Sequence, residues 1–289
     1  MSTAQNIVLA GIDGSSLTNA VCDYAAWIAN KVEAPLKLLH TIDHHPELAD
    51  HTDLTGNIGI DSRDHLLDEL AQLEQQRSKL RLQQGKQLLQ AAKQRVEQAG
   101  ILDPITQQRH GGLLESLIEL ENDLRVLVIG VRGKVHEKQP DKIGAKLEAI
   151  IRSLHKPILV VNADFKIPER IMIAYDASPA AEKAVAMVAN SPLYKGLTCH
   201  LLCVGKDEGV MNRQLAAASV QLLHAGDIDV IARTLPGNPE QVLCDYQEQQ
   251  AIDMTIMGAF SHTRLHDWLL GSFTVKMLTR SHKPLLLLR

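Results

Sequence analysis

The chain has 289 residues, 45% of them hydrophobic and 22% charged, which is enough for two domains with buried cores. Lys and Arg number 30 against 34 Asp and Glu, so the formal net charge is −4, and aromatic residues make up only 3%. We therefore expect neither a nucleic-acid nor a membrane partner, because those partners favour a basic excess, and single strands also stack on aromatic rings.

The cysteines and the N-terminal residues favour a cytoplasmic location. The four cysteines contain no CxxC pair and are too few for a disulfide framework in a chain of this length. The first residues show no basic segment followed by an apolar one, and no apolar run reaches the roughly 18 residues of a membrane span. We expect no signal peptide and no transmembrane segment.

The chain repeats itself, beginning with two pairs of apolar, strand-like runs. Residues 7–13 end in Asp13, and residues 171–176 end in Asp176, 163 positions later. Thr41 ends the next apolar run of the first half and Val204 that of the second half, at the same offset. Self-similarity at a fixed offset indicates a tandem duplication.

Two later pairs of runs complete the repeat. Residues 126–130 correspond to residues 254–258 at an offset of 128, and each half closes with His-Lys-Pro followed by an apolar strand. We therefore predict two domains, residues 1–163 and residues 168–289.

Helical stretches separate these strand-like runs. The predicted helices span residues 16–31, 66–99, 112–120, 146–154, 179–190, 210–224, 239–250 and 273–280. Strands that alternate with helices are typical of βαβ units, which predicts an α/β fold with a parallel sheet covered on both faces. Ligands of such sheets bind beyond the carboxyl ends of the strands, where the strand order switches.

The fall in offset from 163 to 128 means that the first half carries about 35 extra residues, around positions 44–100. Leucines recur there at helical spacing, so we predict a loop followed by a long amphipathic helix. This helix is either a longer version of its second-half counterpart or a partner-binding or lid helix. Four histidines of this stretch lie near acidic residues, which indicates either a zinc site or solvated loop residues. They are His44, His45, His51 and His65.

The second half holds the pattern that is most informative about function. Gly258 ends a strand, Ser261 follows, and Gly271-Ser272 precede a helix nine residues later. A helix N-terminus offers unpaired N–H groups and a positive dipole end to phosphate, and glycine lets the backbone approach oxygens closely. Asp176 then has two readings: it accepts hydrogen bonds from a base or ribose, or it merely precedes a turn into a helix capped by the next serine.

These residues resemble the universal stress protein family, and the duplication resembles its tandem, E-type members. The resemblance rests on Asp176, Val204, the Gly237-Asn-Pro turn, Gly258 and Gly271-Ser272. It implies two five-stranded, Rossmann-like parallel domains that associate through their last strands as an intramolecular pseudo-dimer, and it leaves a homodimer open. Some members bind ATP through the motif G-x2-G-x9-G-[ST].

The resemblance implies an ATP site with Mg²⁺ in the second domain. Gly258, Gly271 and Ser272 fit the motif, Ser261 replaces its second glycine, and Asp176 and Val204 stand at the positions that hold adenosine.

The first domain fits the motif less well. Asp13 and Thr41 stand at its adenosine positions, and the glycine positions are Gly130, Gly133 and Gly144. However, ten residues instead of nine precede the last glycine, and Ala145 replaces the Ser or Thr.

We expect a non-enzymatic stress-response protein that acts through ligand-dependent or partner-dependent association. Two alternatives stay open: a slow ATP hydrolase, and a carrier or sensor of a nucleotide-linked or apolar metabolite. The chain has no G-x4-G-K-[ST] sequence, which excludes an NTPase of the P-loop class.

Overall fold

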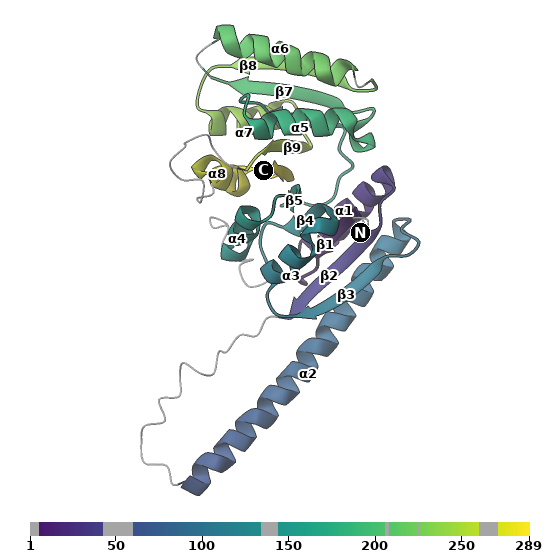
Figure 1. The fold of residues 1–289 in the computed structure, drawn as a ribbon, viewed down its shortest axis with the longest axis vertical. Coiled ribbons are helices and arrows are strands. Elements are labelled where there is room, and N and C mark those ends of the chain that lie inside the picture. The colour runs from purple at the N-terminus through teal and green to yellow at the C-terminus, as the bar shows by residue number, and fades with distance from the viewer. Residues whose placement is uncertain (1–5, 43–59, 134–143, 206–207, 225, 260–270) are drawn as a thin grey trace.

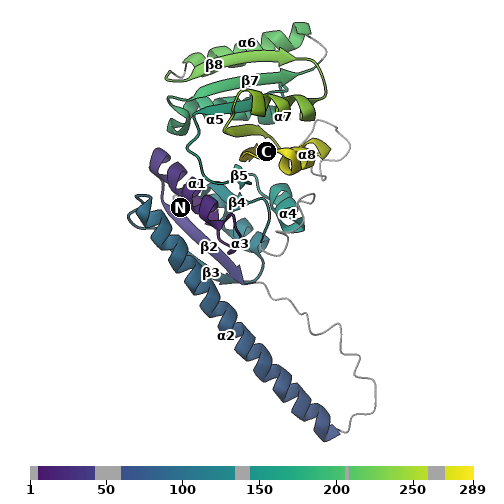
Figure 2. The same ribbon diagram turned by 180° about the vertical axis from the view of Figure 1, so that it is seen from behind.

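The structure is a computed structural model that describes residues 6–42, 60–133, 144–205, 208–224, 226–259 and 271–289. All ten strands form one sheet, in the order β3-β2-β1-β4-β5-β10-β9-β6-β7-β8 (Figures 1 and 2). The strands of the first half are β1 (Ile7–Gly11), β2 (Leu36–Ile42), β3 (Ile105–His110), β4 (Leu124–Gly130) and β5 (Ile158–Val161). Those of the second half are β6 (Arg170–Ala174), β7 (Thr198–Val204), β8 (Asp229–Leu235), β9 (Met254–Gly258) and β10 (Leu285–Leu288).

Helices cover both faces of this sheet. The first half contributes α1 (Thr18–Val32), α2 (Ile60–Gln98), α3 (Leu113–Leu120) and α4 (Ala145–Ser153). The second half contributes α5 (Pro179–Asn190), α6 (Glu208–His224), α7 (Pro239–Gln249) and α8 (Ser272–Arg280). One core cluster includes residues of α1, α2, α5 and α6, and the other includes residues of α3, α4, α7 and α8. Each cluster draws on both halves, so the core is continuous across the molecule.

The strand registers reproduce the repeat that the sequence predicts. Gly11 lies opposite Leu39, and Ala174 lies opposite Leu202, so both partners shift by 163 positions. Val8 of β1 lies opposite Val126 of β4, and Ile171 of β6 lies opposite Met254 of β9, so here the first partner shifts by 163 positions and the second by 128. The tandem α/β fold is therefore confirmed at the level of individual residue pairs.

The two halves meet at their closing strands. β5 and β10 pair antiparallel, with Leu159 opposite Leu286 at the centre, whereas the strands within each half are parallel. This pairing confirms the predicted intramolecular pseudo-dimer. It also gives each closing strand a partner at what would otherwise be an exposed edge.

Helix α2 accounts for the extra length of the first half. It has 39 residues against 17 in α6, and it begins at Ile60, six residues before the predicted start. Its N-terminal half extends well beyond the sheet, while its C-terminal half packs against the first domain (Figures 1 and 2). Arg95 of that packed half donates two hydrogen bonds of 2.7 Å to Asp23 of α1. The predicted preceding loop lies outside the described residues, as do His44, His45, His51 and the side chain of His65.

The linker between β5 and β6 is anchored by one buried carboxylate. Asp253 is 4% exposed and lies directly before β9. Its Oδ1 accepts a 2.6 Å bond from the Lys166 ammonium, and its Oδ2 accepts bonds of 2.9 and 3.1 Å from the backbone N–H groups of Glu169 and Arg170. The neighbouring Phe165 ring packs edge-on against Tyr24 of α1, with ring centroids 4.8 Å apart. The linker is thereby fixed to both domains.

Candidate functional site

Each half of the sheet has one point where the strand order reverses. β6 lies between β7 and β9, and β1 lies between β2 and β4. Asp176 and Gly258 therefore flank the switch point of the second domain, and Asp13 and Gly130 flank that of the first. This is the place where open parallel sheets bind ligands, so the predicted residues Asp176 and Gly258 lie at the same end of the sheet, as do Asp13 and Gly130.

Asp13 and Asp176 have the same local structure. The Oδ1 atom of Asp13 accepts a 2.9 Å bond from the Ser15 N–H, and that of Asp176 accepts a 3.0 Å bond from the Ser178 N–H. Such bonds to the residue two positions on form Asx turns, which direct the chain from strand to helix. Both aspartates are exposed at the end of their strands. The predicted turn is therefore confirmed, and it leaves both carboxylates exposed at the switch points.

The segment after Asp176 also behaves as the sequence predicts. Ser178 Oγ accepts a 3.0 Å bond from the Ala181 N–H, and Pro179 is the first residue of α5. Ala177 adopts a left-handed conformation with φ of 57°, as Gly14 does at the equivalent position with φ of 73°. Ser178 thus satisfies one of the N–H groups at the N-terminus of α5 that have no partner within the helix.

Gly258 is required by a close contact at the switch point. A Cβ atom at this position would lie 2.9 Å from Ala180 Cβ, which is shorter than real Cβ contacts. At Gly130 the nearest atom to a Cβ would be 3.4 Å away. The first glycine of the second site thus permits the start of α5 to approach β9. Ala180 is a residue that motif matching missed, although a small residue next to Pro179 was visible in the sequence.

Helix α8 begins without a side-chain cap. Gly271 is its N-cap, and no acidic residue occurs in the first turn. Thr274 is 1% exposed and donates a 2.8 Å bond to the Ala259 carbonyl, which ties this first turn to the end of β9. Ser272 is exposed at the first helical position. The early N–H groups of α8 therefore lie close to the switch point and can receive an anion. Thr274 was not foreseen.

Helix α4 is the counterpart of α8 in the first domain. It begins after Gly144, also without a side-chain cap, but Glu148 lies in its first turn. A carboxylate there weakens the attraction of the positive helix end for an anionic ligand, although Glu148 also forms an ion pair with Arg152 of the same helix. A Cβ at Gly133 would lie 3.4 Å from Asp13 Oδ2, so the structure brings these two predicted residues together.

The remaining predicted site residues lie where the strands end or beyond the described residues. Val204 is the last residue of β7, and Thr41 is the penultimate residue of β2, both half-buried. Ser261 lies outside the described residues, so its prediction still rests on the sequence alone.

Cys199 and Cys203 are buried on β7, and burial raises the pKa of the Cys199 thiol to about 12. Within the described residues, no group of three or more His, Cys, Asp or Glu side chains is arranged to hold a metal ion. In the same part of the chain, no helix combines the length and apolar character needed to cross a bilayer.

The comparisons with known proteins agree with this geometry. The model of the universal stress protein family matches residues 5–162 and 205–289. The chain belongs to the universal stress protein family. The universal stress protein Slr1230 of Synechocystis sp. is 34% identical over 290 residues, which cover 99% of this chain and 100% of that protein.

Solved structures of universal stress proteins share the fold over the whole chain. The protein from Archaeoglobus fulgidus matches with a TM-score of 0.71 and 20% identity, covering 99% of this chain and 96% of that one. A putative universal stress protein from Pseudomonas aeruginosa matches with a TM-score of 0.61 and 14% identity, covering 99% and 93%. At these identities the likeness extends to the fold alone.

Proposed function

We propose that this tandem universal stress protein is a non-enzymatic cytoplasmic protein that binds ATP, with Mg²⁺, in its second domain. One observation carries the choice of domain: α8 opens at Gly271 with no side-chain cap and no acidic residue in its first turn, beside Gly258 and Asp176. The equivalent helix of the first domain has Glu148 in that turn.

The residues present suit the parts of the nucleotide. Asp176 offers a carboxylate to the base or ribose at the end of β6, with Val204 next to it at the end of β7. The N–H groups at the start of α8 and the Ser272 hydroxyl suit phosphate oxygens, and charge-assisted bonds of this kind contribute about 1.5–3 kcal/mol each. Mg²⁺ would neutralise part of the phosphate charge.

A binding role fits the residues at this switch point better than catalysis. Hydrolysis needs a group that positions the attacking water, and Asp176 already accepts a hydrogen bond from the Ser178 N–H of its own turn. We therefore expect ATP to stay intact in the site, with binding coupled to association with a partner.

Calorimetric titration with ATP and Mg²⁺ tests the site through a matched pair of variants. Asp176→Ala and Asp13→Ala remove the same kind of Asx turn, and Asp13→Ala also removes an exposed bond from the Thr18 hydroxyl. We expect Asp176→Ala to weaken binding about tenfold or more, whereas Asp13→Ala leaves it nearly unchanged. Ser272→Ala should weaken binding, and Ser261→Gly should strengthen it.

The opposite ranking of the two aspartate variants would place the site in the first domain. Undetectable binding by both the wild type and Ser261→Gly would reject the nucleotide site and favour a metabolite carrier. Steady phosphate release in the presence of Mg²⁺ would reject the non-enzymatic role.

A further inference from the structure

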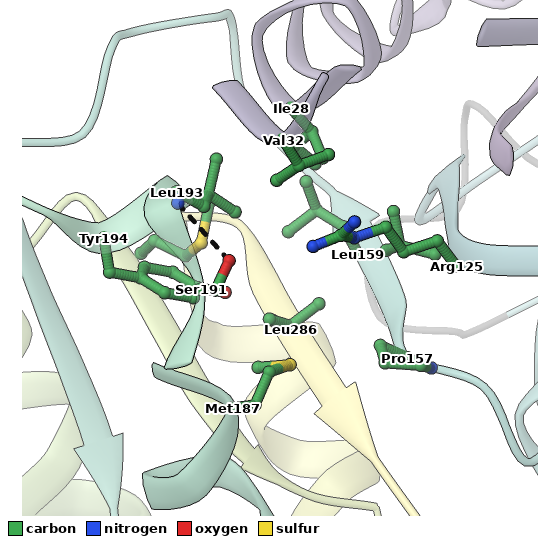
Figure 3. Close-up of a pocket in the computed structure, with 12 residues that line it drawn as sticks. Ile28, Val32, Arg125, Pro157, Leu159, Met187, Ser191, Leu193, Tyr194 and Leu286 are labelled. Carbon is green, nitrogen blue, oxygen red and sulfur yellow. Dashed lines mark hydrogen bonds between the residues drawn. The ribbon is translucent and has the colours of Figure 1, made fainter. Parts of the chain in front are cut away.

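A cavity of about 150 Å³ lies between the two domains, on the face of the sheet that α1 and α5 cover (Figure 3). Leu159 and Leu286 line it and lie opposite each other at the centre of the β5–β10 pair. Val126 of β4 and Met254 of β9, which the repeat makes equivalent, line it as well. The cavity therefore lies beside the pseudo-twofold axis that relates the domains.

The linker fills space on only one side of this axis. There the Phe165 ring packs against Tyr24 of α1, and the Lys166 ammonium bonds to Asp253 before β9. An apolar ring and a neighbouring cation thus occupy the gap between α1 of one domain and the start of β9 in the other. The equivalent gap on the other side of the axis lies between α5 and β4, and none of the described residues that line the cavity belongs to the linker.

The cavity lies in that second gap. The strands that flank α1 correspond to those that flank α5 at an offset of 163 residues, so Met187 is the counterpart of Tyr24. At the offset of 128 residues between β4 and β9, Arg125 is the counterpart of Asp253. Both Met187 and Arg125 line the cavity. Phe165 fills the space beside Tyr24, whereas the equivalent space beside Met187 is open. The charged residue next to this space is the cation Arg125, where the linker side has the anion Asp253.

A break in the strand register accompanies the position of Arg125. Ile7 lies opposite Leu124, but Val8 lies opposite Val126, so Arg125 is an extra residue with no partner in β1. Such bulges redirect a side chain. In Figure 3 the Arg125 guanidinium extends into the cavity. Among the residues that the structure describes, no side chain forms a hydrogen bond or ion pair with this half-buried guanidinium, and a partly desolvated cation favours an anionic partner.

We propose that this cavity binds a small aromatic carboxylate, with its ring between Met187 and the Leu159–Leu286 pair and its carboxylate on Arg125. An apolar cavity of about 150 Å³ accommodates a benzene ring. A guanidinium binds a carboxylate through two parallel hydrogen bonds. The ligand would occupy this gap as the linker occupies the other. Its ring takes the place of Phe165, and its carboxylate binds the Arg125 guanidinium, whereas on the linker side the Lys166 ammonium binds the Asp253 carboxylate.

Titration with phenylacetate, followed by NMR of methyl-labelled methionines, tests this site on the full chain. We expect the Met187 methyl signal to shift on binding. Arg125→Met should weaken binding about 10- to 100-fold, while Arg213→Met, which removes an exposed arginine of α6 that does not line the cavity, should not. Circular dichroism verifies that both variants are folded.

Phenylacetamide provides a second comparison that needs no variant. It has the same ring but no charge, so we expect it to bind the wild-type protein about tenfold or more weakly than phenylacetate. Equal affinities for the two compounds, an unchanged affinity in Arg125→Met, or no shift of the Met187 signal at millimolar phenylacetate would each overturn the proposal.

Discussion

Replacing Asp253 with alanine is expected to destabilise the protein far more than replacing the lysine that bonds to it. The Asp253 carboxylate is 4% exposed and accepts bonds from Lys166 and from two backbone N–H groups, whereas the Lys166 side chain is 60% exposed. Removing the carboxylate therefore deletes three hydrogen bonds, whereas removing the ammonium deletes one and leaves the two backbone N–H donors in place.

The magnitudes follow from this difference. Asp253→Ala removes three charge-assisted bonds, which contribute about 1.5–3 kcal/mol each, and leaves two backbone N–H groups without their acceptor, so it should lower the free energy of unfolding by about 3–5 kcal/mol. Lys166→Ala removes one of three donors and leaves the buried carboxylate bonded to its two backbone N–H groups, so it should cost about 1 kcal/mol. Asp253→Asn keeps an acceptor oxygen and should fall between them, at about 1–2 kcal/mol.

Urea denaturation at neutral pH measures these three values, and a pH series tests their cause. Burial alone would raise the pKa of Asp253, but the Lys166 ammonium and the two N–H groups outweigh it and lower the pKa below its ordinary value. The stabilisation is then fully present above the unfolded-state pKa of about 3.9 and is lost as the pH falls through the lower folded-state pKa. A Lys166→Ala cost equal to that of Asp253→Ala, or an unchanged Asp253→Asn difference down to about pH 2, would refute this reasoning.

Two further predictions concern packing within the domains. Gly258→Ala should lower the free energy of unfolding by about 1–3 kcal/mol, because its Cβ would lie 2.9 Å from Ala180 Cβ, and Ala180→Gly should restore part of that loss. Gly130→Ala, with a nearest atom at 3.4 Å, is the matched control; equal losses at both glycines in thermal unfolding would show that the contact is not the cause. A double-mutant cycle of Asp23 and Arg95 should give a coupling energy of about 1 kcal/mol that decreases with added salt, and a zero value at low salt would mean that this bidentate pair does not hold α2 to α1.

The repeat was predictable because its markers are buried. Central strands such as β1 and β9 are buried on both faces and appear in the sequence as uninterrupted apolar runs. The outermost strands β3 and β8 carry mostly exposed or half-buried residues, including Gln107 and Arg233, and no apolar run marks them. The family resemblance implied five strands in each domain, but only the structure shows which residues form β3 and β8.

The candidate sites divide in the same way. The Asx turns and the cap at Ser178 depend on residues close in sequence, so spacing alone predicted them. The contact of Gly258 with Ala180 and the bond from Thr274 to the Ala259 carbonyl join separate elements across the sheet edge. Nothing local in the sequence specifies such contacts. The start of α2 at Ile60 was also missed, because the leucine pattern begins later than the helix does.

The stoichiometry of ATP binding to the wild-type chain tests the central claim most directly. Calorimetric titration in the presence of Mg²⁺ should give one ATP per chain, because, of the two equivalent helices, α8 begins at Gly271 with a first turn free of carboxylates, whereas Glu148 lies in that turn of α4. Two ATP molecules per chain would contradict the difference that we assign to the two domains, and no binding at millimolar ATP would contradict the nucleotide site itself.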